Sequence, residues 1–175
     1  MRRLLSLLFL LLAPAAFASD ALSPDAARID RWLAEASAEF DVPLEVLQAV
    51  AFVESRWTQL QPSSRRFRDA DHQLQPGAFG VMGLRDDPHF GYSLRDAAAL
   101  IQRTPAELIE DPRLNIRGAA ALLQKYSGGA TRASSAEAWE AAVALYSGIP
   151  ERGIAEMYTY DVFTAILSGR ASDRF

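Results

Sequence analysis

The stretch from Pro43 to Trp57 constrains the fold most, because its apolar residues recur at the spacing of one face of an α-helix. Leu44, Leu47 and Ala51 lie on this face, and Glu54 continues it. Burial of a carboxylate disfavours its ionised form and raises its pKa. A buried Glu54 would therefore be a proton donor near neutral pH. If Glu54 instead lies at a fraying helix end, it faces water and has no such role.

Similar helical patterns recur along the chain, separated by residues that begin or end helices. The predicted helices begin at Ser23-Pro24, Pro43, Ser93, Thr104-Pro105, Asp111-Pro112, Ser134 and about Gly153. Three of these starts have the spacing of a capping box, namely Ser93 with Asp96, Thr104 with Glu107 and Ser134 with Glu137. Between them, Thr58–Gly91 lacks periodicity, which predicts a long irregular loop with a short hairpin around Phe79–Leu84. The fold class is therefore expected to be mainly α.

The N-terminus has the features of a secretory signal. Arg2 and Arg3 precede a short apolar run, and Ala16-Phe17-Ala18 fits the small-x-small cleavage rule. We expect residues 1–18 to be removed, with 19–24 a short linker, 25–170 one domain and 171–175 a tail. The apolar run is short for a membrane span, so we expect an exported, soluble protein, periplasmic or extracellular, without stable membrane insertion.

Composition excludes several classes of function. The chain has no cysteine, which rules out disulfides, thiolate-bound metals and lipidation at cysteine. Removal of Arg2 and Arg3 with the signal leaves 16 basic and 22 acidic residues, a formal net charge of −6. Such a balance argues against nucleic acid as a partner.

Several short motifs occur together in the order that is typical of one enzyme family. They are Val42-Pro43-Leu44, Glu54-Ser55, Gly80-Val81-Met82-Gly83-Leu84, Asp111–Ala119, Ala144-Leu145-Tyr146-Ser147-Gly148, and Tyr158 with Val162. In this the chain resembles the SLT-type lytic transglycosylases, which are goose-lysozyme-like enzymes that cleave peptidoglycan glycan strands. It also looks similar to the transglycosylase-like N-terminal domain of some exported N-acetylmuramoyl-L-alanine amidases. The resemblance covers nearly all of residues 40–168 and implies a lysozyme-like helical bundle whose loop or hairpin flanks a substrate cleft.

The resemblance implies that Glu54 is the catalytic acid. A 2-acetamido sugar can assist its own cleavage, so one carboxylate suffices. Glu54 would protonate the oxygen between N-acetylmuramic acid and N-acetylglucosamine. It would then take the proton of the muramic C6 hydroxyl, which attacks C1 and forms a 1,6-anhydro product. No metal and no cofactor are implied.

The same resemblance implies a set of substrate-binding positions, namely Ser55, Met82, Gly83, Tyr146, Ser147 and Tyr158. The Tyr146 and Tyr158 hydroxyls would orient the acid or the acetamido group, although helical spacing alone is equally typical of core tyrosines. Ser55 would support the helix end or touch substrate. Asn115 is interpreted as structural, because its amide can satisfy backbone groups between helices.

Two positions depart from the family pattern. Gly83 stands where the family has Gln after Gly-Leu-Met, and Ser147 stands where it has Asn after Tyr. Both changes remove polar groups expected to face the sugar. A second hypothesis is therefore a weak or inactive relative that binds cell-wall glycan as an accessory domain.

The loop offers further groups with open interpretations. His72 and His89 lack the third ligand that a zinc hydrolase needs, and are interpreted as loop residues. Acidic residues in the loop could supply a second carboxylate or a loose calcium site, but a solvated loop is the commoner case; they are Asp69, Asp71, Asp86 and Asp87. Arg65–Arg68 could meet anionic wall polymers or simply be solvated. The loop aromatics could form a glycan platform or pin the loop to the core; they are Phe67, Phe79, Phe90 and Tyr92.

Overall fold

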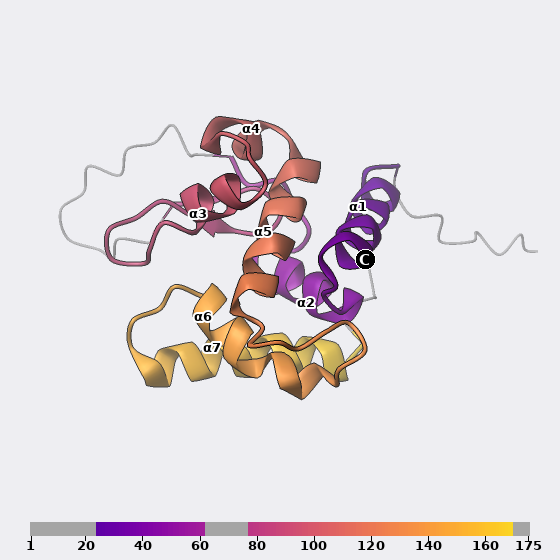
Figure 1. Ribbon diagram of the computed structural model, residues 1–175, viewed down its shortest axis with the longest axis vertical. Coiled ribbons are helices and arrows are strands. Elements are labelled where there is room, and N and C mark those ends of the chain that lie inside the picture. The colour runs from indigo at the N-terminus through magenta and orange to yellow at the C-terminus, as the bar shows by residue number, and fades with distance from the viewer. Residues whose placement is uncertain (1–23, 62–76, 170–175) are drawn as a thin grey trace, which may run out of the picture.

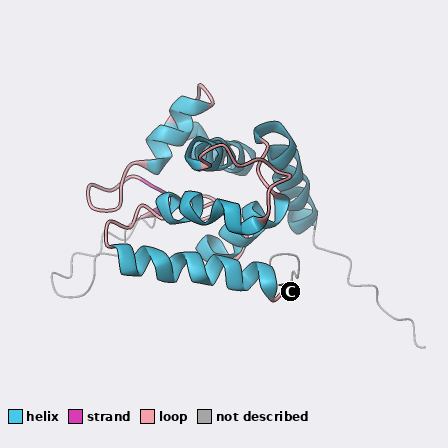
Figure 2. Cartoon of the chain, turned by 60° about the horizontal axis from the view of Figure 1, so that its bottom comes forward, coloured by secondary structure: helices cyan, strands magenta, loops and turns pink. Residues whose placement is uncertain are grey.

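The computed structural model describes residues 24–61 and 77–169. The helices are α1 Pro24–Phe40, α2 Leu44–Ser55, α3 Ser93–Leu100, α4 Pro105–Glu110, α5 Pro112–Tyr126, the 3₁₀ helix η1 Ala136–Trp139, α6 Glu140–Tyr146 and α7 Arg152–Leu167. The strands β1 Ala78–Phe79 and β2 Leu84–Arg85 form an antiparallel pair. The prediction of a mainly α fold is confirmed, and helices dominate the described chain in Figure 2.

The central element is α5, which runs through the middle of the view in Figure 1. It packs against α1, α3, α4 and α6, while α2 packs against α7 and α1. The α5 face that meets these neighbours includes Ile116, Ala119, Leu122 and Leu123, all fully buried. Gly118 also faces inward, and a Cβ there would come within 2.8 Å of the Leu108 side chain. Small residues on α5 thus let the surrounding helices approach closely.

The helix α2 ends in an unusual way directly after the predicted acid. Arg56 and Trp57 both adopt left-handed backbone angles, with φ of 54° and 57°, and neither is glycine. Their N–H groups donate to the carbonyls of Phe52 and Ala51, which closes the helix. The Arg56 guanidinium also donates to the Phe52 carbonyl over 2.6 Å. Such conformations cost energy and persist only where the surrounding contacts determine them.

Most predicted helix starts agree with the structure, but two of the predicted capping boxes are not formed. Thr104 and Glu107 do form the reciprocal box at the start of α4. Ser93 does not cap α3, because its hydroxyl accepts from the Arg85 N–H instead. Ser134 accepts from the Thr131 N–H and lies before η1, not at its N-cap. Each of these two hydroxyls accepts a hydrogen bond from a backbone N–H that precedes the predicted helix.

The irregular loop and hairpin are found where they were predicted, as far as the structure describes them. The described part of the loop includes residues 58–61 and 77–91, and the hairpin pairs Ala78 with Arg85 and Phe79 with Leu84. Pro24, which was assigned to the linker, is the first residue of α1. The predicted signal and tail lie outside the described residues, as do Asp69, Asp71, His72 and Arg65–Arg68. None of the helices within residues 24–61 and 77–169 has the length and apolar character that crossing a membrane requires.

Candidate active site

Glu54 lies in the last turn of α2, and its side chain is only 5% exposed. The interpretation in which Glu54 faces open water is therefore wrong. Burial raises the pKa of the Glu54 carboxyl above its ordinary value, against the opposing effects of Arg85 and Tyr158. Glu54 is thus an acid that holds its proton to higher pH than an exposed glutamate does.

Arg85 supplies the one hydrogen bond that the Glu54 carboxylate accepts within the described part of the chain. Its Nη2 lies 3.2 Å from Oε2 of Glu54. Arg85 belongs to β2, where Leu84 points into the core and Arg85 is 19% exposed at its side chain. The guanidinium also stands 6.0 Å from the centre of the Phe90 ring. Arg85 is not among the residues predicted from the sequence, and its only local signal is the alternation of an apolar and a charged residue at Leu84-Arg85.

Two tyrosines from different helices surround the same carboxylate. The Tyr158 hydroxyl on α7 is buried and close enough to lower the Glu54 pKa, but its geometry falls short of a formed hydrogen bond. The Tyr146 hydroxyl on α6 donates to the Met82 carbonyl over 2.6 Å. Burial, and then the charge of Glu54, raise the pKa of both tyrosines well above the ordinary value. Both hydroxyls therefore keep their protons at neutral pH and can act as donors.

Gly83 packs directly against the acid. A Cβ at this position would stand 2.3 Å from Oε2 and 2.7 Å from Cβ of Glu54. Its φ of +63° is also one that residues with side chains rarely adopt. The absence of a side chain at Gly83 thus coincides with close backbone approach to Glu54, and Arg85 supplies the polar contact to the carboxylate.

The turn Gly80–Gly83 is held by side chains from three helices. Asn115 of α5 accepts from the Met82 N–H over 2.9 Å and donates to the carbonyls of Phe79 and Leu108. Tyr146 of α6 binds the Met82 carbonyl, and Ser55 of α2 lies 2.6 Å from the Val81 carbonyl. Asn115 therefore has the structural role that the sequence predicted. Met82 itself is fully buried, so it shapes the site through its backbone.

Two of the predicted substrate-binding serines lie in the interior. Ser55 is buried, and its hydroxyl lies between the carbonyls of Val81 and Ala51. Ser147 is 1% exposed, donates to the Ala144 carbonyl and accepts from the Ile149 N–H. Contact between Ser147 and a sugar would require the turn after α6 to open. The structure thus brings Glu54, Gly83, Tyr146 and Tyr158 together but leaves the serines on backbone groups.

The acidic residues of the described loop segment 86–92 contact the segment itself and the first turn of α3. Asp86 lies 2.8 Å from Arg95, and the Asp87 carboxylate accepts from the N–H groups of His89 and Phe90. His89 is exposed. In residues 24–61 and 77–169, no three side chains of His, Cys, Asp or Glu gather closely enough to hold a metal ion.

The aromatic side chains of the loop take different places. Phe79 is half-buried and packs against the core, and the half-buried Phe90 lies beside Arg85. Tyr92 is exposed, with the Arg95 guanidinium 4.7 Å from its ring centre. Phe67 lies outside the described residues. Phe79 thus pins the loop to the core, whereas Tyr92 is available to a ligand.

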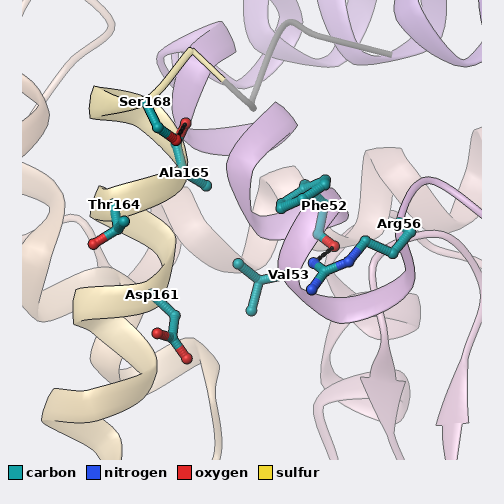
Figure 3. Close-up of a pocket in the computed structure, with 7 residues that line it drawn as sticks. All are labelled: Phe52, Val53, Arg56, Asp161, Thr164, Ala165 and Ser168. Carbon is teal, nitrogen blue, oxygen red and sulfur yellow. Dashed lines mark hydrogen bonds between the residues drawn. The ribbon is translucent and has the colours of Figure 1, made fainter. Parts of the chain in front are cut away.

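A pocket opens between the C-terminal halves of α2 and α7, as Figure 3 shows. It is lined by Phe52, Val53, Arg56, Asp161, Thr164, Ala165 and Ser168. Glu54 is not among these residues, so this pocket is not the predicted cleft beside the acid. Searches against protein-family models, curated proteins and solved structures found no match to the chain.

Proposed function

We propose that this protein is an exported lytic transglycosylase that cleaves the bond between N-acetylmuramic acid and N-acetylglucosamine in peptidoglycan. The observation that carries the proposal is the buried carboxyl of Glu54, whose pKa is raised by burial at the end of α2. An acid for glycoside cleavage must reach neutral pH with its proton in place, and burial is the usual way to achieve this.

The neighbours of Glu54 support a mechanism with a single acid. Glu54 donates its proton to the glycosidic oxygen, the substrate acetamido group stabilises the positive charge at C1, and the muramic C6 hydroxyl then attacks C1. Glu54 accepts the proton of this hydroxyl and is regenerated. The Tyr158 hydroxyl is buried, unpartnered within the described residues and close to Glu54, which supports a role in which it holds the carboxylate or the acetamido oxygen.

The test is incubation of the purified protein with purified sacculi, followed by mass analysis of the released products. We expect 1,6-anhydro muropeptides from the wild type and a loss of at least a hundredfold in Glu54→Gln, since general acid catalysis contributes about 10²–10⁴-fold. Glu45→Gln is the matched control, because Glu45 is an exposed residue on the same helix. Products with reducing ends, or equal activity in the two variants, would contradict the proposal.

A second function has its own supporting observations. Gly83 offers no side chain to a sugar, and the Ser147 hydroxyl is engaged by backbone groups. These features favour an accessory domain that binds cell-wall glycan without cleaving it. Retention of the wild type on sacculi with no soluble product would establish this alternative.

A further inference from the structure

Arg85 has hydrogen-bonding capacity that its contact with Glu54 does not use. A guanidinium group carries five N–H donors in a planar fork. In Arg85 the contact between Nη2 and Oε2 of Glu54 is the only hydrogen bond that this fork forms with the described residues. The side chain is 19% exposed, whereas that of Glu54 is 5% exposed. The guanidinium thus reaches solvent at the point where a ligand would approach the acid.

The contact between Arg85 and Glu54 leaves guanidinium N–H donors for a second carboxylate. Arginine binds a carboxylate most strongly through two parallel N–H···O bonds, and the contact at 3.2 Å uses only one. A ligand carboxylate beside Glu54 would be able to accept the remaining donors. It would also compete with Glu54 for the guanidinium. The two carboxylates would repel each other unless one of them is protonated.

We propose that Arg85 binds a carboxylate that the glycan carries beside the scissile bond, and that it releases Glu54 from their ion pair in doing so. The inference rests on the proposed function, and it names the substrate class. Muramic acid carries a lactyl group whose carboxylate is free only when no peptide is attached. The preferred substrate is therefore a peptide-free glycan strand. An amide hydrolysis that leaves the carboxylate on the sugar and an amine on the peptide must supply it.

Release of Glu54 would favour its protonated, active form. Arg85 from β2 and Tyr158 from α7 affect the Glu54 pKa, and Glu54 in turn affects the pKa of Tyr146 from α6. Of these, Arg85 is the only cation, and it lowers the Glu54 pKa against the rise that burial causes. When Arg85 turns to a ligand carboxylate, the Glu54 pKa rises, and Glu54 takes up a proton from solvent. Binding and activation of the acid are thereby coupled through one side chain.

The experiment compares two peptide-free glycan oligomers of equal length. One has free lactyl carboxylates, and in the other they are converted to methylamides, so the two differ mainly in charge. Cleavage (kcat and KM) and affinity by calorimetry are measured for the wild type, Arg85→Gln and Arg85→Lys. Arg152→Gln is the control, because Arg152 is 91% exposed and pairs with Glu156 on the surface of α7.

We expect the wild type to prefer the free carboxylate by about tenfold or more, mostly in KM, since hydrogen bonds between charged groups have about this strength. In Arg85→Gln the preference should fall to within about twofold, whereas Arg85→Lys should keep part of it, because it retains the charge but not the fork. In Arg85→Gln the alkaline limb of kcat/KM should also move to higher pH. Arg152→Gln should match the wild type.

The outcomes separate the inference from the proposed function. Cleavage of both oligomers with equal efficiency by the wild type would overturn the inference and leave the proposed function standing. An unchanged preference or an unchanged pH profile in Arg85→Gln would also overturn it. Cleavage of sacculi but of neither oligomer would also overturn the inference. Absence of cleavage of sacculi and of both oligomers would overturn the proposed function, and the affinities would then decide the inference. Tighter binding of the carboxylate form only when Arg85 is present would support it, and equal binding would reject it.

Discussion

At the residue scale, Gly83 is the position where backbone and acid come closest. Its missing side chain has two separate physical reasons, namely the positive φ and the space that Glu54 occupies. Gly128 has the same φ of +63°, yet no atom lies within 4 Å of a Cβ placed there. A comparison of the two glycines therefore separates the cost of the backbone conformation from the cost of the steric contact with Glu54.

We expect Gly83→Ala to lower the free energy of unfolding by about 1–3 kcal/mol more than Gly128→Ala does. Both variants lose stability because they place a side chain in the left-handed region, but only Gly83→Ala must also displace Glu54. Chemical denaturation of the two variants and the wild type measures the difference. Equal losses would contradict the prediction, because they would mean that Glu54 moves aside at no cost in stability.

At the element scale, the hairpin turn is the piece that joins three helices around the acid. Ser55, Asn115 and Tyr146 come from α2, α5 and α6, and each binds a backbone group of residues 81–82. Asn115 also packs against Gly80, where a Cβ would meet its amide nitrogen at 2.1 Å. The position of Arg85 two residues beyond this turn depends on these contacts.

We expect Asn115→Ala to destabilise the protein by about 3 kcal/mol, because two buried hydrogen bonds and one partly buried hydrogen bond to backbone groups are lost. Exchange of the Met82 amide hydrogen with solvent should accelerate in line with this loss of stability. Thr104→Ala is the control, since it removes the capping box of α4 at an exposed site and should cost about 1 kcal/mol. If Asn115→Ala leaves Met82 exchange unchanged, Asn115 does not hold the turn.

At the scale of the whole molecule, Glu54 and the surface carboxylates affect the stability in opposite directions as pH changes. Hydrogen bonding and the charge of Arg117 lower the pKa of Glu39, so its contribution is present above its unfolded pKa and is lost as pH falls. Glu54 has a raised pKa in the folded state. Its contribution is complete below its unfolded pKa and is lost as pH rises through its folded pKa.

We expect the difference in unfolding free energy between the wild type and Glu54→Gln to change with pH. As pH rises from about 4.5, the wild type should lose stability relative to the variant, because ionised Glu54 is buried and glutamine does not titrate. Unfolding curves at several pH values measure this difference. Glu45→Gln is the control for the loss of an exposed carboxylate on the same helix. A constant difference for Glu54→Gln would show that the fold does not perturb the Glu54 carboxyl.

The sequence predicted helix positions well and the details of the site less well. Proline starts and apolar spacing act over a few residues, so α1, α2, α5 and α7 begin close to the predicted residues. The hydroxyls of Ser93 and Ser134 have local partners of comparable strength, and the spacing of a capping box cannot show which partner they take.

The sequence by itself determined that the chain is mainly helical and that an acid ends the second helix, because both depend on local periodicity. Only the tertiary structure decided what surrounds that acid. Gly83 and Arg85 reach Glu54 from the hairpin, and Tyr158 reaches it from α7, more than a hundred residues further along the chain. Contacts over such separations follow from helix packing and the folding of the turn, which no local pattern records.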